Sequence, residues 1–292
     1  MTLGRTGTTV RGLTIGALGS VVAAALLRGH PPGGVERWTR QNHAGRPVTL
    51  FEGPAYAVGA VAGALAGGAG CPAAVAGLGA AAFGGLDDLA GDSSSKGLRG
   101  HLAAARRGEL TTGVVKIVGL GVTGLWSARM IDRSGERRGV LGTLAGGAVI
   151  AGSANIANML DLRHGRALKV VLLLAVPIVA GGRGTHLSTT ARTATATAGA
   201  AAGAAACALP DDLSGRSMLG DTGANSAGAL LGTALVARTG PRGRLLALAV
   251  VTALTLASEK VSFTTVIEST PGLRELDAFG RPPRPSPTAS LT

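Results

Sequence analysis

Long stretches without Asp, Glu, Lys or Arg alternate along the chain with short clusters of charged residues. The uncharged stretches are residues 12–27, 53–86, 117–128, 139–160, 170–182, 193–210, 222–237 and 245–258. A helix that crosses the hydrocarbon core of a bilayer needs about 17–25 predominantly apolar residues. The pattern therefore predicts an all-α fold, a polytopic bundle of transmembrane helices.

Two stretches do not fit a single helix as they stand. The longest, 53–86, has Gly70 and Pro72 near its middle, which predicts two helices joined by a tight turn. The stretch 117–128 is too short unless residues 110–115 join it and Lys116 extends its ammonium to water. With these adjustments we expect about nine spanning helices. Residues 1–267 would form the membrane domain, and residues 268–292 a cytoplasmic tail with a disordered, Pro-rich end.

The composition agrees with a membrane protein. Of the 292 residues 48 are Gly, only 2% are aromatic and only 15% are charged, against roughly 25% charged in ordinary soluble domains. Mean hydropathy is +0.36. This composition disfavours a water-soluble enzyme and excludes a disordered chain. The abundance of small residues has two explanations, close helix packing in the membrane or a compositional bias of the source genome.

The charges give an orientation. The net charge of +12 does not indicate a nucleic-acid partner, because the aromatic side chains that stack bases are missing. It agrees instead with loops that face anionic lipid. All acidic residues except Asp132 and Glu136 fall in the connections 28–52, 87–116, 161–169 and 211–221 or after residue 258. We predict a multi-pass plasma-membrane protein with this face cytoplasmic and functional, although Arg5, Arg11 and the basic cluster at 129–138 oppose that orientation.

Three acidic motifs lie on this face. In GLDDLAGD, residues 85–92, the adjacent Asp87 and Asp88 suit a Mg²⁺ site or a metal ligand beside a base; the alternative is a solvated turn. In ANIANMLD, residues 154–161, Asn155 and Asn158 share a helical face that Asp161 continues. These groups suit a nucleotide or a metal-bound water, or else cap the helix end.

The third motif is MLGDTGANSAG, residues 218–228. It places Asp221 at the start of a helix between two glycines, where a metal–phosphate group can approach the backbone. The alternative is an Asp that caps the helix. A further match, the GxGxxG of Gly119, Gly121 and Gly124, is dismissed as a dinucleotide site because it lies inside an apolar span without alternating strands. Cys71 and Cys207 form no disulfide framework.

Taken in order, these motifs resemble the polyprenyl-phosphate N-acetylhexosamine-1-phosphate transferases. That family includes the UDP-N-acetylmuramoyl-pentapeptide phosphotransferase and the UDP-N-acetylglucosamine–undecaprenyl-phosphate transferase. LGDTGANSAGALLG, residues 219–232, is similar to the family's GDxGS helix opening. LDD at residues 86–88, followed by KGL at residues 96–98, is similar to the family's aspartate-pair loop. NIANMLD at residues 155–161 is similar to its NxxNxxD loop. The resemblance implies the family's ten-helix fold without its last helix.

The resemblance also implies roles for the matching residues. Asp221 would be a Mg²⁺ ligand, and Asp87 and Asp88 would serve the metal or deprotonate the lipid phosphate. Asp161 would take part in catalysis or bind the nucleotide. The substrate-binding residues would be Lys96 on the diphosphate, Asn155 and Asn158 on the nucleotide, and Asn42, His43 and Arg46 on the lipid phosphate. For the last three the alternative is ordinary positive-inside charge.

The implied reaction transfers a sugar-1-phosphate from a UDP-sugar to undecaprenyl phosphate and releases UMP, in cell-envelope glycan synthesis such as that of peptidoglycan. Two departures oppose full activity. The family's DGxDG appears here as DLRHG, so that His164 takes the second aspartate position, and residues 258–280 contain no histidine where the family has a His-rich loop. The alternatives are a catalytically altered relative that binds lipid-linked precursors or scaffolds envelope synthesis, and, with less support, a transporter. A homodimer is left open.

Overall fold

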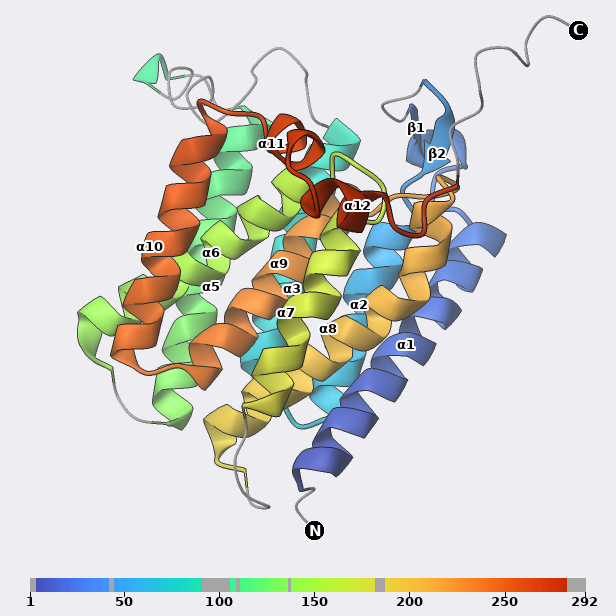
Figure 1. The fold of residues 1–292 in the computed structure, drawn as a ribbon. Helices are drawn as coiled ribbons and strands as arrows, with labels where there is room; N and C mark the ends of the chain where they lie inside the picture. Colours follow the sequence, from blue (N-terminus) through green and yellow to red (C-terminus); the bar gives the residue numbers. More distant parts are fainter. Residues whose placement is uncertain are drawn as a thin grey trace, which may run out of the picture.

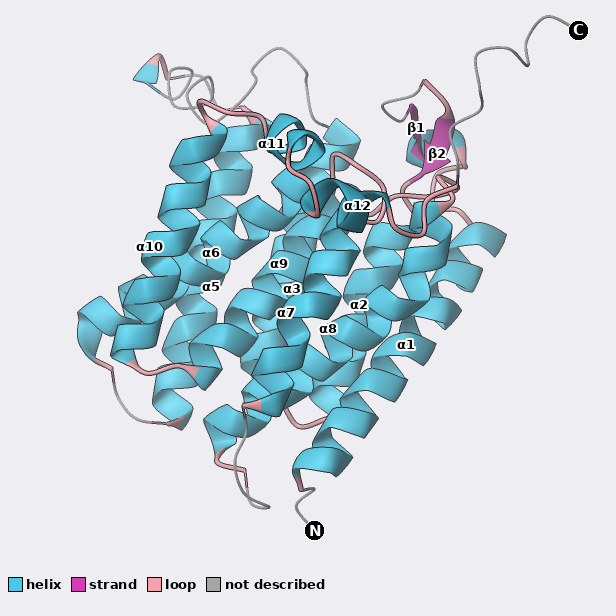
Figure 2. Cartoon of the chain, viewed as in Figure 1, coloured by secondary structure: helices cyan, strands magenta, loops and turns pink. Residues whose placement is uncertain are grey.

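The computed structural model describes residues 4–41, 45–90, 106–108, 111–135, 138–181 and 187–282, and these residues form a bundle of helices (Figure 1, Figure 2). The long helices are α1 (Arg5–Gly29), α2 (Glu52–Ala66), α3 (Cys71–Ala90), α5 (Thr112–Ser134), α6 (Gly139–Leu160), α7 (Arg166–Ala180), α8 (Thr189–Leu213), α9 (Gly220–Arg238) and α10 (Pro241–Ser258). The predicted helical bundle is confirmed. A 3₁₀ turn (Glu36–Trp38) and a small antiparallel hairpin of β1 (Thr39–Gln41) and β2 (Pro47–Thr49) were not predicted.

The number of spanning helices is smaller than the predicted nine when length and hydropathy are both required. Among the described residues α1, α3, α5 and α6 are long and apolar enough to cross a bilayer, and α10 joins them if it is counted with α11 (Phe263–Ser269), which is bent from it by 93°. Helices α8 and α9 are largely covered by their neighbours. A helix that does not face lipid can carry Thr, Ser and Asn. The structure supports a multi-pass membrane protein.

In the two stretches that did not fit a single helix, 53–86 and 117–128, the backbone follows the prediction from the sequence. Helices α2 and α3 are separated by a turn in which Gly68 and Gly70 have φ of +87° and +73°, a conformation that favours glycine. Helix α5 runs without interruption through residue 116. The Lys116 side chain is only 15% exposed and its ammonium pairs with two carboxylates at the end of the bundle, so it does not end in open water as predicted.

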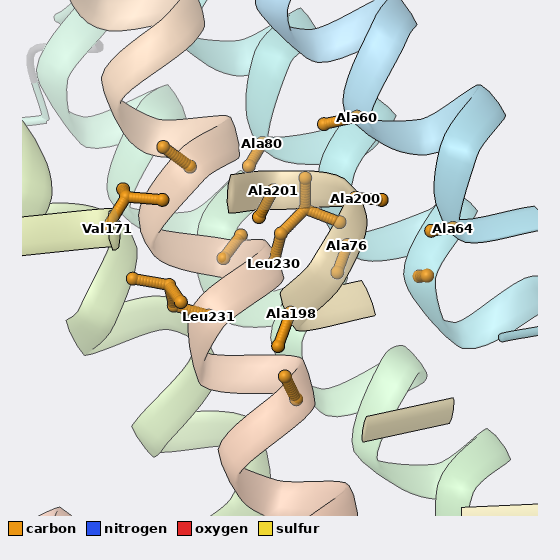
Figure 3. Close-up of a cluster of buried hydrophobic side chains, with 14 of the residues drawn as sticks. Ala60, Ala64, Ala76, Ala80, Val171, Ala198, Ala200, Ala201, Leu230 and Leu231 are labelled. Atoms are coloured by element: carbon orange, nitrogen blue, oxygen red, sulfur yellow. The ribbon is translucent and has the colours of Figure 1, made fainter. Parts of the chain in front are cut away.

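Small residues let the helices approach closely. A Cβ atom on Gly63 of α2 would lie 2.5 Å from the carbonyl oxygen of Gly12 and 2.5 Å from the nitrogen of Gly16, both in α1. In the centre of the bundle, Leu230 of α9 lies among alanines of α3 and α8 (Figure 3). Two of the three glycines of GxGxxG pack in the same way inside α5: a Cβ on Gly119 would meet the ring of Phe83, and a Cβ on Gly124 would lie 2.5 Å from the Gly147 carbonyl oxygen. This packing favours the structural explanation of the small residues.

The C-terminal segment lies across one end of the bundle, where α11 and α12 (Leu273–Ala278) cover the ends of the long helices (Figure 1). The Arg166 guanidinium, at the start of α7, donates to both carboxylate oxygens of Asp277 at 2.8 and 3.1 Å, and Arg281 donates to them at 2.9 and 3.1 Å. Residues 268–282, expected to be a tail, are therefore fastened to the bundle. The Pro-rich end, 283–292, lies outside the described residues.

This attachment is expected to depend on pH. Burial raises the pKa of Asp277, but the hydrogen bonds from Arg166 and Arg281 outweigh it and hold the pKa below its ordinary value. A depressed pKa stabilises the fold above the ordinary aspartate pKa of about 3.9, and that stabilisation is lost as the pH falls through the folded value. The protection factors of the amides in residues 263–282, which correct the exchange rates for the intrinsic effect of pH, should be high at pH 7 and fall in acid, whereas those of Asp277→Asn should be low already at pH 7. Equal protection factors of both proteins at pH 7 would contradict this role of Asp277.

Candidate functional site

Three carboxylates and one lysine meet at the end of the bundle that α11 and α12 cover. Asp87 and Asp88 come from the last turn of α3, Asp221 from the first turn of α9 and Lys116 from near the start of α5. The Lys116 ammonium donates to Asp87 Oδ2 at 2.6 Å and also to Asp221. The side chains of Lys116, Asp87 and Asp221 are 15%, 22% and 25% exposed. The first and third sequence motifs are therefore brought into one site that remains open to water.

Asp88 is used differently from Asp87. Its Oδ1 accepts from the backbone N–H of Asp221 at 3.0 Å, and its Oδ2 accepts from the N–H and the hydroxyl of Thr222 at 2.8 and 2.6 Å. Asp88 thus supplies from another helix the capping interaction that the first N–H groups of α9 lack. The alternative that Asp221 itself caps this helix is wrong, since Asp221 lies inside the first turn and makes no such bond.

Glycines make this close arrangement possible. Gly220 has φ of +59°, and a Cβ there would lie 3.1 Å from both Asp88 oxygens. A Cβ on Gly84 of α3 would lie 2.2 Å from the carbonyl oxygen of Asp221. Arg40 of β1 extends to the carbonyl oxygen of Asp88 and connects the hairpin to the end of α3. Larger residues at the two glycines would push the carboxylates apart.

A second group of acidic residues surrounds Asp161, which follows the last turn of α6. Asp161 is buried, and its pKa is raised well above the ordinary value by burial and by the negative charges of Asp212 and Glu52. Glu52 hydrogen-bonds to Ser217. The raised pKa favours the protonated form of Asp161, which suits a group that exchanges a proton during catalysis. Asp161 is linked electrostatically to Asp88 and Asp221, without a direct hydrogen bond to either.

His164, in the loop that follows α6, has a partner of its own. His164 Nδ1 lies 3.0 Å from Asp212 Oδ1, and the other Asp212 oxygen accepts from the backbone N–H of Gly165 at 2.8 Å. This contact joins the loop after α6 to the end of α8. The histidine is therefore held in a fixed place at the site rather than left in solvent.

Among the described residues, no hydrogen bond joins Asn155 or Asn158 to the carboxylates of the site. Asn155 and Asn158 are half-buried on α6, and the Asn155 amide lies 3.2 Å from Met159 Sδ in the same helix. Arg46 is exposed beside the start of β2. Lys96, Asn42 and His43 lie outside the described residues. Their roles stay predictions.

Sequence reasoning missed several residues of the site. Lys116 gave the clearest indication in the sequence that it belongs to the site, because a lysine that interrupts an apolar stretch inside a bundle usually has a charged partner. Glu52, at the very start of an apolar stretch, was a similar signal. Arg40, Thr222 and Asp212 gave none, because their roles depend on which helix ends come together.

The donor set fits one kind of metal site. Among the described residues no group of three or more His, Cys, Asp or Glu side chains is placed to hold a metal ion. Mg²⁺ is commonly held by only one or two carboxylates together with substrate phosphates. Asp87 and Asp221, which share Lys116, offer such a pair. The metal role predicted for Asp88 finds no support in its contacts, since both of its oxygens cap α9.

An apolar groove begins beside Asp161. It has a volume of about 540 Å³, lies between α7 and α10 over α6 and α9, and extends from Leu160, which precedes Asp161, to Thr239 at the far end of α9. Its walls are almost entirely apolar, with Val170, Leu231 and Leu254 among them. A groove of this kind at membrane depth can take a hydrocarbon chain whose polar end lies near Asp161.

Comparison with known proteins does not assign the chain. No model of a known protein family matches it, and no curated protein is similar enough in sequence to count as a match.

Proposed function

We propose that the protein is an integral membrane phosphoglycosyl transferase of the polyprenyl-phosphate type. It would transfer a sugar-1-phosphate from a UDP-sugar to a polyprenyl phosphate at the cytoplasmic face of the plasma membrane. The observation that carries this proposal is the meeting of Asp87, Asp88 and Asp221 near Lys116, with Asp161, close enough to interact electrostatically with them, at the start of the apolar groove. A water-soluble anion and a lipid anion can both approach such a place.

The reaction asks the site to bring two anions together. A phosphate oxygen of the acceptor attacks the β-phosphorus of the UDP-sugar, and the bond from that phosphorus to the bridging oxygen breaks, so that UMP leaves with the electron pair. Lys116 would bind the diphosphate, and Asp87 orients its ammonium. Asp221 and Asp87 would hold Mg²⁺, which, when bound, offsets the charge of the reactants. Asp88 fixes the start of α9 and with it the position of Asp221.

The other predicted residues take places around this centre. Asp161, whose raised pKa keeps a proton available, would exchange it with the acceptor phosphate or the leaving group. Asn155 and Asn158 would bind the nucleotide, and Lys96 the diphosphate. Asn42, His43 and Arg46, which lie between β1 and β2 in the sequence, would bind the lipid phosphate.

The direct test is UMP release by the purified full-length protein. Incubated in detergent with undecaprenyl phosphate, Mg²⁺ and a panel of UDP-N-acetylhexosamines, it should release UMP with at least one donor. EDTA should abolish the release because the reactants lose their counter-charge, and excess Mg²⁺ should restore it. A folded protein that releases no UMP with any donor would overturn the proposed activity.

The groove makes a separate prediction about the acceptor. Leu254 lines the groove and Leu256 of the same helix does not, although both are exposed on α10. Leu254→Trp should raise the KM for the polyprenyl phosphate by about tenfold, the loss expected when roughly two buried methylene groups no longer fit, and should leave the KM for the UDP-sugar unchanged. Leu256→Trp is the matched control. Equal effects of the two substitutions would remove the groove from the acceptor site.

A catalytically altered relative that binds lipid-linked precursors or scaffolds envelope synthesis is the second candidate. Two observations favour it. His164, at the position of the family's second aspartate, is paired with Asp212. Helices α11 and α12 contain no histidine. Such a protein would retain labelled undecaprenyl phosphate in an equilibrium binding assay while it releases no UMP. We include a homodimer in this second proposal.

A further inference from the structure

A hollow of about 680 Å³ opens at the end of the bundle opposite the acidic site, between the last turns of α5 and the start of α6. In Figure 1 this is the lower end of the bundle, away from α11 and α12. Three arginines line it, Arg129 and Arg133 from α5 and Arg138 from the residue before α6. None of the activity proposed above uses this place.

The charge of the hollow is positive because its one lining carboxylate is already neutralised. Asp132 accepts from Arg244 at 2.7 and 3.2 Å and from the Thr143 hydroxyl at 2.7 Å. Arg244 is only 1% exposed, so this ion pair belongs to the interior. Among the described residues no carboxylate pairs with Arg129 or Arg133, both of which are exposed. Glu136 and Arg137 lie outside the described residues.

Part of the wall of the hollow is apolar and exposed. Trp126, Arg129 and Arg133 follow one another at helical spacing on the same face of α5. Trp126 and Leu144, both lining residues, are 59% and 48% exposed. Tryptophan is enriched where a membrane protein passes through the headgroup region. Arginines toward the water and apolar side chains toward the hydrocarbon form the complement of an acidic lipid.

We propose that this hollow binds an anionic phospholipid of the leaflet opposite the acidic site. Arg129 and Arg133 bind its phosphate through charge-assisted hydrogen bonds, and Trp126 and Leu144 contact the upper part of its acyl chains. A free phosphate would not use the apolar wall, which is why the lipid is the better occupant. The proposal also explains the basic cluster at 129–138, which opposes the orientation given by the acidic residues: its charge would serve a bound lipid.

The test uses quenching of Trp126 by brominated lipids. The chain has two tryptophans, and Trp38→Phe leaves Trp126 as the only one. In mixed micelles of the full chain, acyl-brominated phosphatidylglycerol should quench Trp126 half-maximally at a mole fraction about thirtyfold lower than brominated phosphatidylcholine, because each of the two basic side chains near an acidic headgroup contributes roughly 1 kcal/mol. Equal quenching by the two lipids, or none by either because a second copy of the chain covers Trp126, overturns the proposal.

The variants locate the effect. Arg129→Gln with Arg133→Gln should abolish the preference for phosphatidylglycerol, whereas Arg11→Gln with Arg242→Gln, two exposed arginines at the same end of the bundle, should keep it. If the first variant does not fold, the salt dependence of the unsubstituted arginine site tests the proposal instead. Raising the ionic strength to about 0.5 M should weaken the preference for phosphatidylglycerol, and a preference that persists contradicts the proposal. Excess inorganic phosphate should not displace the lipid, and full displacement would assign the site to a soluble anion instead.

Discussion

Replacing Asp221 by asparagine is expected to lower UMP release by a hundred- to a thousandfold, about the loss caused by removing one electrostatic group from a catalytic site. Asn keeps the shape of the side chain and can still accept a hydrogen bond from Lys116, but it removes the charge that Mg²⁺ and the ammonium share. The fold should survive because the start of α9 is held by Asp88, not by Asp221. The measurement is the initial rate of UMP release at saturating donor and acceptor.

Asp211→Asn is the matched control for this variant. Asp211 lies at the same end of the bundle and has the same side-chain exposure of 25%, but it pairs with Arg28 and Arg216 at the surface rather than with Lys116. Its substitution should change the rate by less than about twofold, since surface ion pairs contribute little. Similar rates for Asp221→Asn and the parent would remove Asp221 from catalysis. Equal losses in both variants would indicate a general charge effect instead of a site.

Gly63→Leu is expected to destabilise the protein by about 3 kcal/mol or more, the upper range for overpacking a tight interface. A Cβ at this position would lie 2.5 Å from backbone atoms of α1, so the helices must separate before any side chain fits. Separation would also open contacts between α1 and α8, where a Cβ on Gly203 would lie 2.0 Å from the Leu13 carbonyl oxygen. The measurement is thermal unfolding in detergent.

Gly121→Leu provides the control, because Gly121 lies inside α5 and a Cβ there has no atom within 4 Å. The two substitutions make the same chemical change in the interior of a helix, so their difference reports the interface alone. Gly121→Leu should leave the unfolding temperature unchanged or raise it slightly, as leucine favours helix more than glycine. An equal loss in the two variants would mean that glycine is not required where α1 and α2 meet.

The helical architecture could be read from the sequence because it depends on local pattern. Uncharged stretches of sufficient length predict helices in a membrane, and their breaks coincide with Gly68–Gly70 and with the ends of α6. The number of spans could not be read in this way. Hydropathy measures how a helix suits lipid, and α8 and α9 face other helices instead.

The site was only partly predictable for a related reason. Asp87, Asp88 and Asp221 stood out because carboxylates beside apolar stretches are costly without a partner. The different contacts of these carboxylates could not be predicted. Asp87 and Asp88 are adjacent in sequence, but Asp87 pairs with Lys116 and Asp88 caps another helix. Two neighbours on a helix point about 100° apart, so the helices that pack around them decide what each one meets.

The sequence by itself determined that the chain is a helical membrane protein with its carboxylates concentrated at a few helix ends. These properties follow from hydrophobicity, helix length and turn residues, which act within a few residues along the chain. The tertiary structure alone decided that Lys116 lies between Asp87 and Asp221, that His164 pairs with Asp212, and that Arg244 neutralises Asp132. Each of these contacts joins residues from different helices, so it depends on how the helices pack in three dimensions, which no local pattern specifies.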